Sequence, residues 1–371
     1  MNNQGLKTAI VYDWVDSKGG IERVIPLLIK EFNADLFTSY FDIKKAPWAN
    51  KYEIKSSFIN KLPRFIKKNR LLSLVLYPYA FESFNFSDYD LVISISSAFS
   101  KSVITKPSTK HINYLLTPTR YFWVDKESYF KNPIIRKIGR IILPKLKKWD
   151  IIAASKPDTI ISISNLVKKR VKQVYKRNSS VIYPPFDINY WTKIKNSLSK
   201  PLSIKHAFFL LVSRLEPYKR IDIAIEAFNK LGNNLIIVGS GSQKRKLKKT
   251  SGKNITFVEN LSDKDLAKLY SKANALIMPQ IEEFGMVSLE AQFFGCPVIS
   301  YKNSGAKETI IEEKTGIFFN KQASKSLIAA IVRYKSISYN LKKSTKENSF
   351  KNIKRFDKEK FIYDFKKVAY L

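Results

Sequence analysis

The chain has 371 residues, of which 44 % are hydrophobic, and its 66 lysines and arginines outnumber its 31 acidic residues to give a net charge of +35. The hydrophobic content excludes an intrinsically disordered chain, and the length predicts two domains. The single cysteine, Cys296, excludes an intrachain disulfide, and no apolar stretch reaches the ~18 residues that a membrane-spanning helix needs.

The positive charge predicts an anionic partner or surface. Three interpretations stay open: an anionic membrane leaflet, a lysine-rich composition with solvated side chains, and a nucleic acid. The basic residues are spread along the chain without a recognisable nucleic-acid-binding module, so we expect no nucleic-acid partner. The polar first residues do not predict a signal peptide, and we expect a cytoplasmic protein, peripheral at the inner face of the cell membrane.

The N-terminal half alternates apolar runs with helical patterns, which is typical of a parallel sheet. Four runs of the kind found in buried strands are 8–12, 90–96, 112–116 and 159–164. Gly19 and Gly20 open a helix with apolar residues at helical spacing. The paired prolines Pro184 and Pro185 cannot continue a strand, so we expect a first domain over residues 1–187.

The C-terminal half repeats this alternation after a lysine-rich loop at 192–205. Its predicted strands are 208–212, 235–238, 255–258, 275–278 and 298–300. Ser262, three residues before Asp265, predicts the start of a helix. We expect a second α/β domain over 188–350, followed by a helical segment over 351–371.

Two segments combine apolar and basic residues. In residues 134–149 an apolar helical stripe lies opposite a basic face, and the stripe consists of Ile135, Ile138, Ile142, Leu146 and Trp149. It predicts either a helix on an anionic membrane surface or a helix packed on the first sheet with its basic face in solvent. Residues 64–68 together with 71–79 are a second candidate for membrane contact.

The most specific signal is a pair of glutamates, Glu282 and Glu290, separated by seven residues. They follow a strand-like run and enter a helical run closed by Gly295, and open α/β sheets bind ligands at such strand-to-helix loops. Free amide groups near Gly285 and Met286 would point at a bound ligand. This arrangement suits a sugar hydroxyl, a ribose and a phosphate together, and predicts a nucleotide-sugar enzyme.

The segment resembles the E-x7-E signature of retaining glycosyltransferases of family 4, which have the GT-B fold. Other segments match the family in the same order: the glycine loop at 19–24, the R-L-x-x-x-K phosphate clamp at 213–219, the glycine turn at 238–241 and the strand at 295–299. Two more, 117–123 and 183–187, are similar to segments of bacterial O-antigen-type mannosyltransferases. The resemblance implies an α/β protein with two Rossmann-like parallel-sheet domains facing a cleft, and a C-terminal helix that returns to the first domain.

The resemblance also implies roles for charged residues. Arg214 and Lys219 would neutralise the charge that develops on a leaving diphosphate. Glu290 would hold the ribose hydroxyls, and Glu282 would contact the donor sugar, with the neighbouring Glu283 as the alternative. The predicted catalytic residues are thus Glu282, Arg214 and Lys219. The remaining predicted donor contacts are Gly19, Gly20, Gly239, Phe284, Gly285, Met286 and Val287.

The predicted acceptor side is a cationic and aromatic cluster, Arg120, Tyr121 and Trp123, which suits a lipid diphosphate. Aromatic packing within a loop is the alternative. No metal site and no cofactor are expected, because the two histidines lack the spacing of metal ligands. Ser97 and Leu116 depart from the family, because each occupies a position where the resembled mannosyltransferases carry a histidine.

We therefore expect a retaining, metal-independent hexosyltransferase acting on a glycan or polyisoprenoid-linked acceptor in surface polysaccharide or lipopolysaccharide synthesis. Mannose from GDP-mannose is the favoured donor sugar, and an anionic membrane surface is an expected partner. Two alternatives stay open. One is a catalytically weakened binding protein of the same fold, which the residues at Ser97 and Leu116 favour. The other is a nucleotide-sugar epimerase, which needs additional acid and base groups near the sugar.

Overall fold

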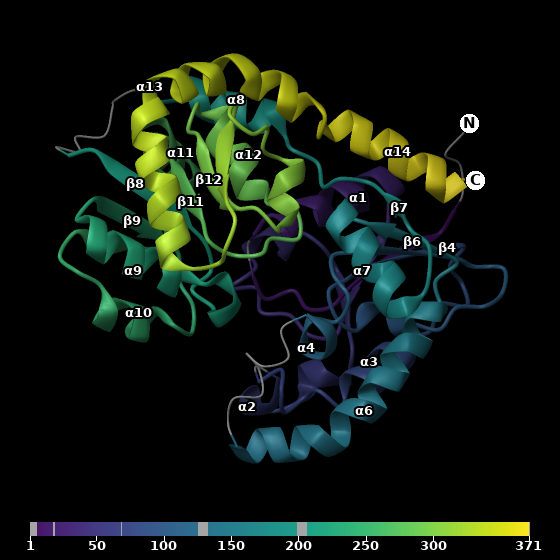
Figure 1. Cartoon of the computed structure of the whole chain (residues 1–371). Helices are drawn as coiled ribbons and strands as arrows, with labels where there is room; N and C mark the ends of the chain where they lie inside the picture. Colours follow the sequence, from purple (N-terminus) through teal and green to yellow (C-terminus); the bar gives the residue numbers. More distant parts are fainter. Residues whose placement is uncertain (1–5, 18, 68, 125–132, 199–205, 371) are drawn as a thin grey trace. The chain divides into compact units, whose positions relative to one another are not determined.

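The computed structural model describes residues 6–17, 19–67, 69–124, 133–198 and 206–370. The chain divides into two compact units: Met1–Pro184 with Phe361–Leu371, and Pro185–Lys360 (Figure 1). The first unit thus ends just before the predicted boundary at 187. The second unit continues past the predicted end at 350, because one long helix extends across that position.

The first unit contains a seven-stranded sheet in the order β3-β2-β1-β4-β5-β6-β7, in which every strand pair is parallel. Its strands are β1 Thr8–Tyr12, β2 Asp35–Thr38, β3 Ile54–Ser56, β4 Leu91–Ser96, β5 Lys110–Leu115, β6 Thr159–Ser162 and β7 Ser180–Val181. The central strands β1 and β4 are buried along their whole length. The structure confirms the four predicted strands, whereas the short strands β2 and β3 at one edge and β7 at the other are not among them.

The first unit also contains helices and short 3-10 turns. They are η1 Ile21–Arg23, α1 Val24–Phe32, η2 Pro47–Ala49, η3 Phe58–Lys61, α2 Arg64–Lys67, α3 Tyr77–Glu82, η4 Ser100–Ser102, α4 Arg120–Trp123, α6 Pro133–Ser155, α7 Asn165–Tyr175 and α14 Lys358–Tyr370. In α14, Phe361 and Phe365 pack against Tyr114 of β5, and Phe365 also contacts Phe32 of α1. Part of the predicted C-terminal helical segment therefore packs on the first unit's sheet.

The predicted amphipathic segment lies within α6. Leu146 is buried in the first unit's core, and Ile142 and Trp149 pack against the same core. The packed-helix interpretation therefore holds for these three residues, and they are not a face available to a membrane. The side chains of Ile135 and Ile138 lie outside the described residues.

The second unit contains a six-stranded parallel sheet in the order β10-β9-β8-β11-β12-β13. Its strands are β8 Phe208–Val212, β9 Asn234–Val238, β10 Ile255–Val258, β11 Leu276–Met278, β12 Val298–Tyr301 and β13 Gly316–Phe319. All five predicted strands are confirmed. The sixth, β13, begins at Gly316, where a Cβ would lie 2.3 Å from the carbonyl oxygen of Val298. This close approach to β12 is a tertiary feature that local β-propensity does not encode.

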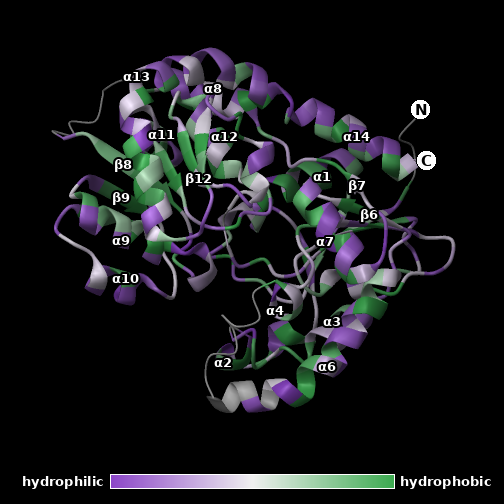
Figure 2. Ribbon diagram, viewed as in Figure 1, coloured by the Kyte–Doolittle hydropathy of each residue, from purple (hydrophilic) through white to green (hydrophobic). Residues whose placement is uncertain are grey.

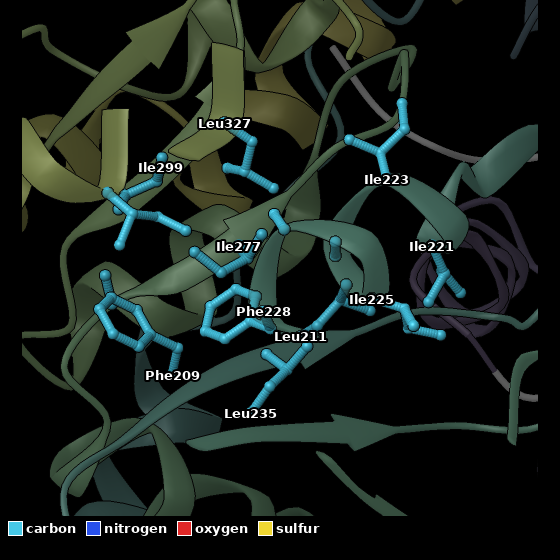
Figure 3. Packing of buried hydrophobic residues seen from close by; sticks show 14 of the residues in the cluster. Phe209, Leu211, Ile221, Ile223, Ile225, Phe228, Leu235, Ile277, Ile299 and Leu327 are labelled. Carbon is cyan, nitrogen blue, oxygen red and sulfur yellow. The ribbon is translucent and has the colours of Figure 1, made fainter. Parts of the chain in front are cut away.

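Apolar residues from strands and helices form the second unit's core. Figure 3 shows Phe209 and Leu211 of β8 packed with Phe228 of helix α9 and Ile277 of β11. Figure 2 shows the complementary pattern, with hydrophobic residues along β12 and hydrophilic residues along much of α13. The helices of this unit are α8 Ile188–Asn196, η5 Pro217–Lys219, α9 Ile221–Leu231, α10 Lys244–Thr250, α11 Asp263–Lys272, α12 Met286–Phe293, η6 Gly305–Glu308 and α13 Ser324–Lys354.

The predicted helix start at Ser262 is confirmed. The Ser262 side chain caps α11 by accepting a hydrogen bond from the Asp265 amide at 3.1 Å. Among the helices of the described residues, none has the length and apolar character required to cross a bilayer.

Candidate functional site

The candidate site of the second unit lies at one edge of its sheet. Because all six strands are parallel, the loops that follow β8, β9, β11 and β12 emerge at the same edge. These loops carry, in chain order, Arg214, Gly239, Glu282 and Ser304. The topology thus brings together residues from distant parts of the sequence.

Lys219 and Glu282 form an ion pair, with 2.6 Å between Lys219 Nζ and Glu282 Oε1. Their side chains are 13 % and 17 % exposed, so the pair is only partly screened by water. The side-chain amide of Gln280 donates to the same oxygen at 2.7 Å. No described residue donates to the other carboxylate oxygen, Oε2. One oxygen of Glu282 is thus held by the protein, and the second is left for a hydroxyl donor.

Tyr218 links the two predicted phosphate-binding cations. Arg214 Nη2 donates to the Tyr218 hydroxyl at 2.8 Å, and Lys219 Nζ lies 5.5 Å from the centre of the Tyr218 ring. The guanidinium is exposed, whereas the ammonium is largely buried. An exposed, planar guanidinium and a largely buried ammonium are a combination that suits the phosphate oxygens of a diphosphate.

The loop after β9 packs closely against the loop that carries Arg214. A Cβ on Gly239, which has φ +138°, would lie 2.0 Å from the Ser213 carbonyl oxygen. A Cβ on Gly241 would lie 2.6 Å from the carbonyl oxygen of Leu215. The structure therefore gives both glycines a role in positioning the Arg214 loop. The donor contact of Gly239 stays a prediction.

Glu290 lies in the second turn of α12, as expected, and is 7 % exposed. The hydroxyl of Tyr270, on the neighbouring helix α11, donates to Glu290 Oε2 at 3.0 Å. Tyr270 is completely buried, and its ring stacks on Phe294 with 6.2 Å between ring centres. Tyr270 is a positioning residue that the sequence analysis did not identify, because its partner lies 20 residues away on another helix.

The start of α12 has the predicted free amide groups. Gly285 precedes the helix in the left-handed conformation, with φ +101°, and no side chain caps the N-terminus of the helix. The first amide groups of the helix, those of Met286 and Val287, have no acceptor within the helix. They point along the helix axis, where the helix dipole favours a group that carries negative charge.

Two neighbours of Glu282 differ from it in their surroundings. The ring of Phe284 is 3 % exposed and lies 5.2 Å from the ring of Phe356, so a donor contact at this residue is left to its main chain. Glu283 is 9 % exposed. Lys219 pairs with Glu282 and not with Glu283, which favours Glu282 as the sugar-side carboxylate.

The main chain at Glu282 is fixed by the loop after β12. The Glu282 amide donates to Ser304 Oγ at 3.1 Å, and the Gly305 amide donates to the Glu282 carbonyl oxygen at 2.7 Å. A Cβ on Gly305 would lie 2.1 Å from the Glu283 carbonyl oxygen. Glycine at position 305 is therefore required for this approach, and no sequence motif pointed to it.

In the first unit the predicted glycine loop surrounds a carboxylate. Glu22 is 8 % exposed and accepts hydrogen bonds from Tyr12 Oη at 3.1 Å and Ser17 Oγ at 2.8 Å. A Cβ on Gly19 would lie 2.8 Å from Glu22 Oε2. The space beside Gly19 thus holds a negative charge, which opposes a phosphate at that point. Gly19 makes room for Glu22, and the predicted donor contacts of Gly19 and Gly20 stay predictions.

Ser97, one of the departures from the family, belongs to a buried anion-binding turn. Asp13 is fully buried and accepts hydrogen bonds from four consecutive amides, those of Ser97, Ala98, Phe99 and Ser100, at 2.7–3.0 Å. The Ser97 hydroxyl also donates to Asp13, at 3.0 Å. Because it is engaged in this way, Ser97 is a structural residue here and not a substitute for the histidine.

The predicted acceptor cluster is partly a packing element. Tyr121 is 6 % exposed and belongs to the first unit's core, so packing, rather than an acceptor contact, explains it. The indole nitrogen of Trp123 donates to Asp150 Oδ2 at 2.8 Å, and Lys147 lies 4.5 Å from the centre of its ring. Arg120 is half-buried and begins α4. Its acceptor contact stays a prediction.

A buried ion pair fixes the start of α4. Lys101 and Asp150 are 1 % and 0 % exposed, with 2.7 Å between Nζ and Oδ1. Asp150 also accepts hydrogen bonds from Thr119 Oγ1 at 2.6 Å and from Tyr175 Oη at 2.8 Å. The sequence analysis missed this network, because its members come from four different elements.

The remaining titratable groups of interest are buried. Burial lowers the pKa of His111 to about 3, and its imidazole lies 2.8 Å from Ser94 Oγ, so it is neutral near pH 7. Burial also raises the pKa of the Cys296 thiol to about 12. Among the described residues, no group of three or more histidine, cysteine or acidic side chains is arranged to hold a metal ion.

Comparison with known proteins finds a family match within the second unit. Residues 194–352 match the model of the family described as glycosyl transferases group 1. The alpha-1,3/1,6-mannosyltransferase ALG2 of Dictyostelium discoideum is 28 % identical over 239 residues, which cover 53 % of this chain and 56 % of the relative. The human ALG2 is 29 % identical over 189 residues, covering 43 % and 45 %. The chain therefore spans about half the length of the curated relatives it matches.

Solved structures resemble nearly the whole chain. Sucrose-phosphate synthase from Thermosynechococcus elongatus superposes with a TM-score of 0.72 at 17 % identity, over 98 % of both chains. Anabaena HepE in complex with UDP-glucose superposes with a TM-score of 0.70 at 16 % identity, over 98 % of this chain and all of that one. The two parallel sheets and these similarities identify the GT-B fold. The match to the glycosyl transferases group 1 model lies within the second of these two sheet-containing units.

Proposed function

We propose that the chain is a retaining, metal-independent hexosyltransferase that uses a nucleoside diphosphate sugar. The observation that carries this proposal is the cluster at the sheet edge of the second unit. There Lys219 contacts Glu282, Tyr218 joins Lys219 to Arg214, and Tyr270 holds Glu290. Cations for a diphosphate and carboxylates for two sets of sugar hydroxyls lie on loops and helices of one parallel sheet.

In the proposed reaction the bond between the anomeric carbon and the β-phosphate oxygen breaks, and both electrons go to the diphosphate. Arg214 and Lys219 stabilise the charge that develops there, and this charge is greater in the transition state than in the bound donor. The acceptor hydroxyl oxygen bonds to the anomeric carbon, and its proton passes to the released diphosphate. Glu282 Oε2 accepts a hydrogen bond from the transferred sugar, while Glu290 binds the ribose.

For the donor we propose GDP-mannose. The matches to ALG2 mannosyltransferases support mannose, and the similar structure that contains UDP-glucose supports nucleoside diphosphate sugars as a class. Gly19, Gly20, Gly239, Met286 and Val287 are proposed to contact this donor through main-chain groups.

For the acceptor we propose a glycan or polyisoprenoid-linked glycan in surface polysaccharide or lipopolysaccharide synthesis. Such acceptors are anchored in the membrane, so the reaction is proposed to occur in the cytoplasm at the inner face of the cell membrane. The net charge of +35 supports association with an anionic leaflet. Arg120 is the proposed contact to the acceptor diphosphate.

One alternative is supported by a specific observation. Ser97 is tied to Asp13 and offers no acid or base where the resembled transferases carry a histidine. A protein of this fold that binds a nucleotide sugar without transferring it would share this feature.

The test combines binding with turnover. A panel of nucleotide sugars is screened by the shift of the melting temperature, and nucleotide release is then measured with the best donor. We expect Arg214→Ala and Glu282→Gln to reduce release by about 100-fold or more, on the scale seen when one transition-state contact is removed. The matched controls Arg245→Ala and Glu313→Gln, at exposed positions of the same unit, are expected to release nucleotide like the unsubstituted chain.

The outcomes separate the candidates. Binding without any release of nucleotide supports the binding protein. Equal release by Arg214→Ala, Glu282→Gln and the unsubstituted chain refutes the assigned roles. No stabilisation by any nucleotide sugar refutes both functions.

A further inference from the structure

The segment around α3 exposes apolar side chains on one side. Main-chain hydrogen bonds from each residue to the fourth before it link Ser73 to Asn69, Tyr77 to Ser73, and Ala80 to Leu76. Residues 69–83 therefore follow a helical path, in which residues three or four apart share a face. The buried residues are Leu74, Tyr77, Ala80 and Phe81, whereas Leu72, Val75 and Tyr79 are 57 %, 41 % and 67 % exposed. The exposed residues have the spacing of one outer face.

The neighbouring helix α2 adds a further apolar residue and two cations. Ser73 Oγ donates to the Ile66 carbonyl oxygen at 2.6 Å, which ties α2 to the helical path. On α2, Phe65 is 70 % exposed, and Arg64 and the nearby Lys61 are also exposed. We call Lys61, Arg64, Phe65, Leu72, Val75 and Tyr79 the α2–α3 patch.

The sequence around the patch is basic throughout. Between Glu53 and Glu82 there is no acidic residue, and the cations in this interval are Lys55, Lys61, Arg64, Lys67, Lys68 and Arg70. Two of the six are paired, Lys55 with Asp35 and Arg70 with Asp16, each at 2.9 Å. Among the described residues, no carboxylate forms an ion pair with Lys61 or Arg64.

A basic pocket lies beside the patch. Its volume is about 340 Å³, and it is lined by the charged residues Lys44, Arg64, Lys67 and Asp42 and by Tyr40, Phe41 and Ile43. Lys67 Nζ also donates to the Asn60 carbonyl oxygen at 2.8 Å. Three cations against one carboxylate make the pocket suited to an anionic headgroup.

We propose that the α2–α3 patch docks on an anionic lipid membrane. Phe65, Leu72 and Tyr79 would enter the interface between headgroups and acyl chains, and Lys61 and Arg64 would contact lipid phosphates. Apolar side chains exposed together and flanked by cations are costly in water and match this partner in both polarity and charge. The proposal extends the proposed function, because a membrane-anchored acceptor requires the enzyme at that surface, but the surface chemistry that carries it is independent of catalysis.

The second unit offers matched controls. On α13, Tyr339 and Phe350 are 81 % and 50 % exposed but lie eleven residues apart, with Glu347 between them. Arg245 and Lys246 on α10 are both exposed. Each patch variant thus has a control with the same residue types and the same change of net charge.

The experiment is co-sedimentation of the full chain with phosphatidylcholine vesicles, with and without phosphatidylglycerol. The unsubstituted chain is expected to bind only the anionic vesicles. Lys61→Gln/Arg64→Gln is expected to weaken partitioning about 30-fold, at roughly fivefold for each cation near the surface, while Arg245→Gln/Lys246→Gln binds as before. Phe65→Ser/Tyr79→Ser is likewise expected to weaken binding, unlike Tyr339→Ser/Phe350→Ser.

Equal binding by the patch variants and their controls would overturn the proposal, as would an absence of binding to anionic vesicles. Binding to RNA or to an acidic protein with no binding to vesicles would assign the charge to another partner and overturn it as well. The melting-temperature shift with the nucleotide sugar is recorded on every variant. That shift reports on the proposed function alone, so a failure of membrane docking is distinguishable from a failure of the enzyme assignment.

Discussion

Replacing Tyr270 with phenylalanine tests whether a single hydroxyl orients the carboxylate of Glu290, which is proposed to bind the ribose. The substitution keeps the buried ring and its stacking on Phe294, and it removes the hydrogen bond of 3.0 Å to Glu290 Oε2. A hydrogen bond to a charged group contributes about 1.5–3 kcal/mol net. Glu290 is 7 % exposed, so water replaces the lost donor only in part. If the carboxylate binds the ribose only in its present orientation, this energy is lost from donor binding.

The expected result is a dissociation constant for the nucleotide that rises about 10- to 100-fold, since 1.4 kcal/mol corresponds to a factor of ten. Isothermal titration calorimetry with the nucleoside diphosphate measures it directly. The same titration with the 2′-deoxy and 3′-deoxy nucleotides completes a thermodynamic cycle. In the unsubstituted chain the missing hydroxyl weakens binding, and in Tyr270→Phe it costs less, because Glu290 is no longer oriented toward it.

The control is Tyr334→Phe, which removes a buried tyrosine hydroxyl that donates to the Asn274 carbonyl oxygen. This bond lies before β11, at the end of that strand opposite the loop of Glu282. A Tyr270→Phe protein that binds nucleotide as tightly as the unsubstituted chain would refute the reasoning. The same conclusion would follow if the penalty for a deoxyribose were identical in both proteins.

Three further predictions concern stability. Lys101→Met alone, or Asp150→Leu alone, leaves a buried charge without its partner and is expected to lower the free energy of unfolding of the first unit by about 3–5 kcal/mol, measured in urea. The double substitution is expected to cost less than either single one, and additive losses would contradict this. The pKa of His111 is about 3 in the folded chain and roughly 6.5 in the unfolded chain, so the unfolded chain binds more protons below pH 6.5. The free energy of unfolding therefore falls, as the pH is lowered below 6.5, by up to ~1.4 kcal/mol per pH unit. His111→Leu should flatten this slope between pH 6.5 and 5, and an unchanged slope would exclude His111 as its source. Gly239→Ala should lower the free energy of unfolding of the second unit by about 2 kcal/mol or more. The control Gly232→Ala should cost less, because Gly232 also has a positive φ but a Cβ added there meets no atom within 4 Å. Equal costs would show that the lack of space at Gly239 is not the cause.

Most of the strands were predictable from the sequence, because buried parallel strands are continuous apolar runs. Strands β8 and β10 have the predicted limits, and β1 does as well. The strands outside the predicted set, β2, β3, β7 and β13, are two to four residues long and lie toward the sheet edges. They form because a neighbouring strand supplies hydrogen-bond partners, which no local pattern records.

The charged residues of the candidate site were predicted, but the groups that position them were not. Arg214, Lys219 and Glu282 stand out because charge beside a strand end has no packing explanation. Tyr270 and Gln280 resemble ordinary core residues in the sequence, since a buried polar group reveals its role only through its partner. That partner lies 20 residues away for Tyr270 and two residues away, within the same loop, for Gln280.

The same reasoning explains why the amphipathic pattern of residues 134–149 left a membrane-bound helix and a packed helix as two open interpretations. The stripe of α6 and the outer face around α3 both repeat apolar residues at helical spacing. Periodicity identifies that a helix has an apolar side, and the fold decides what covers it. In α6 the first unit's core covers Leu146, whereas Tyr79 remains 67 % exposed.

The glycines of the motifs show a related limit. Gly19 and Gly239 were both predicted to contact the donor. In the structure the atom that comes closer than a Cβ permits belongs to the protein: Glu22 Oε2 at Gly19, and the Ser213 carbonyl oxygen at Gly239. A glycine in a motif specifies that some atom needs the space of a side chain. It does not specify whose atom it is, so the motif predicts a close approach and only the fold distinguishes a ligand from a neighbouring loop.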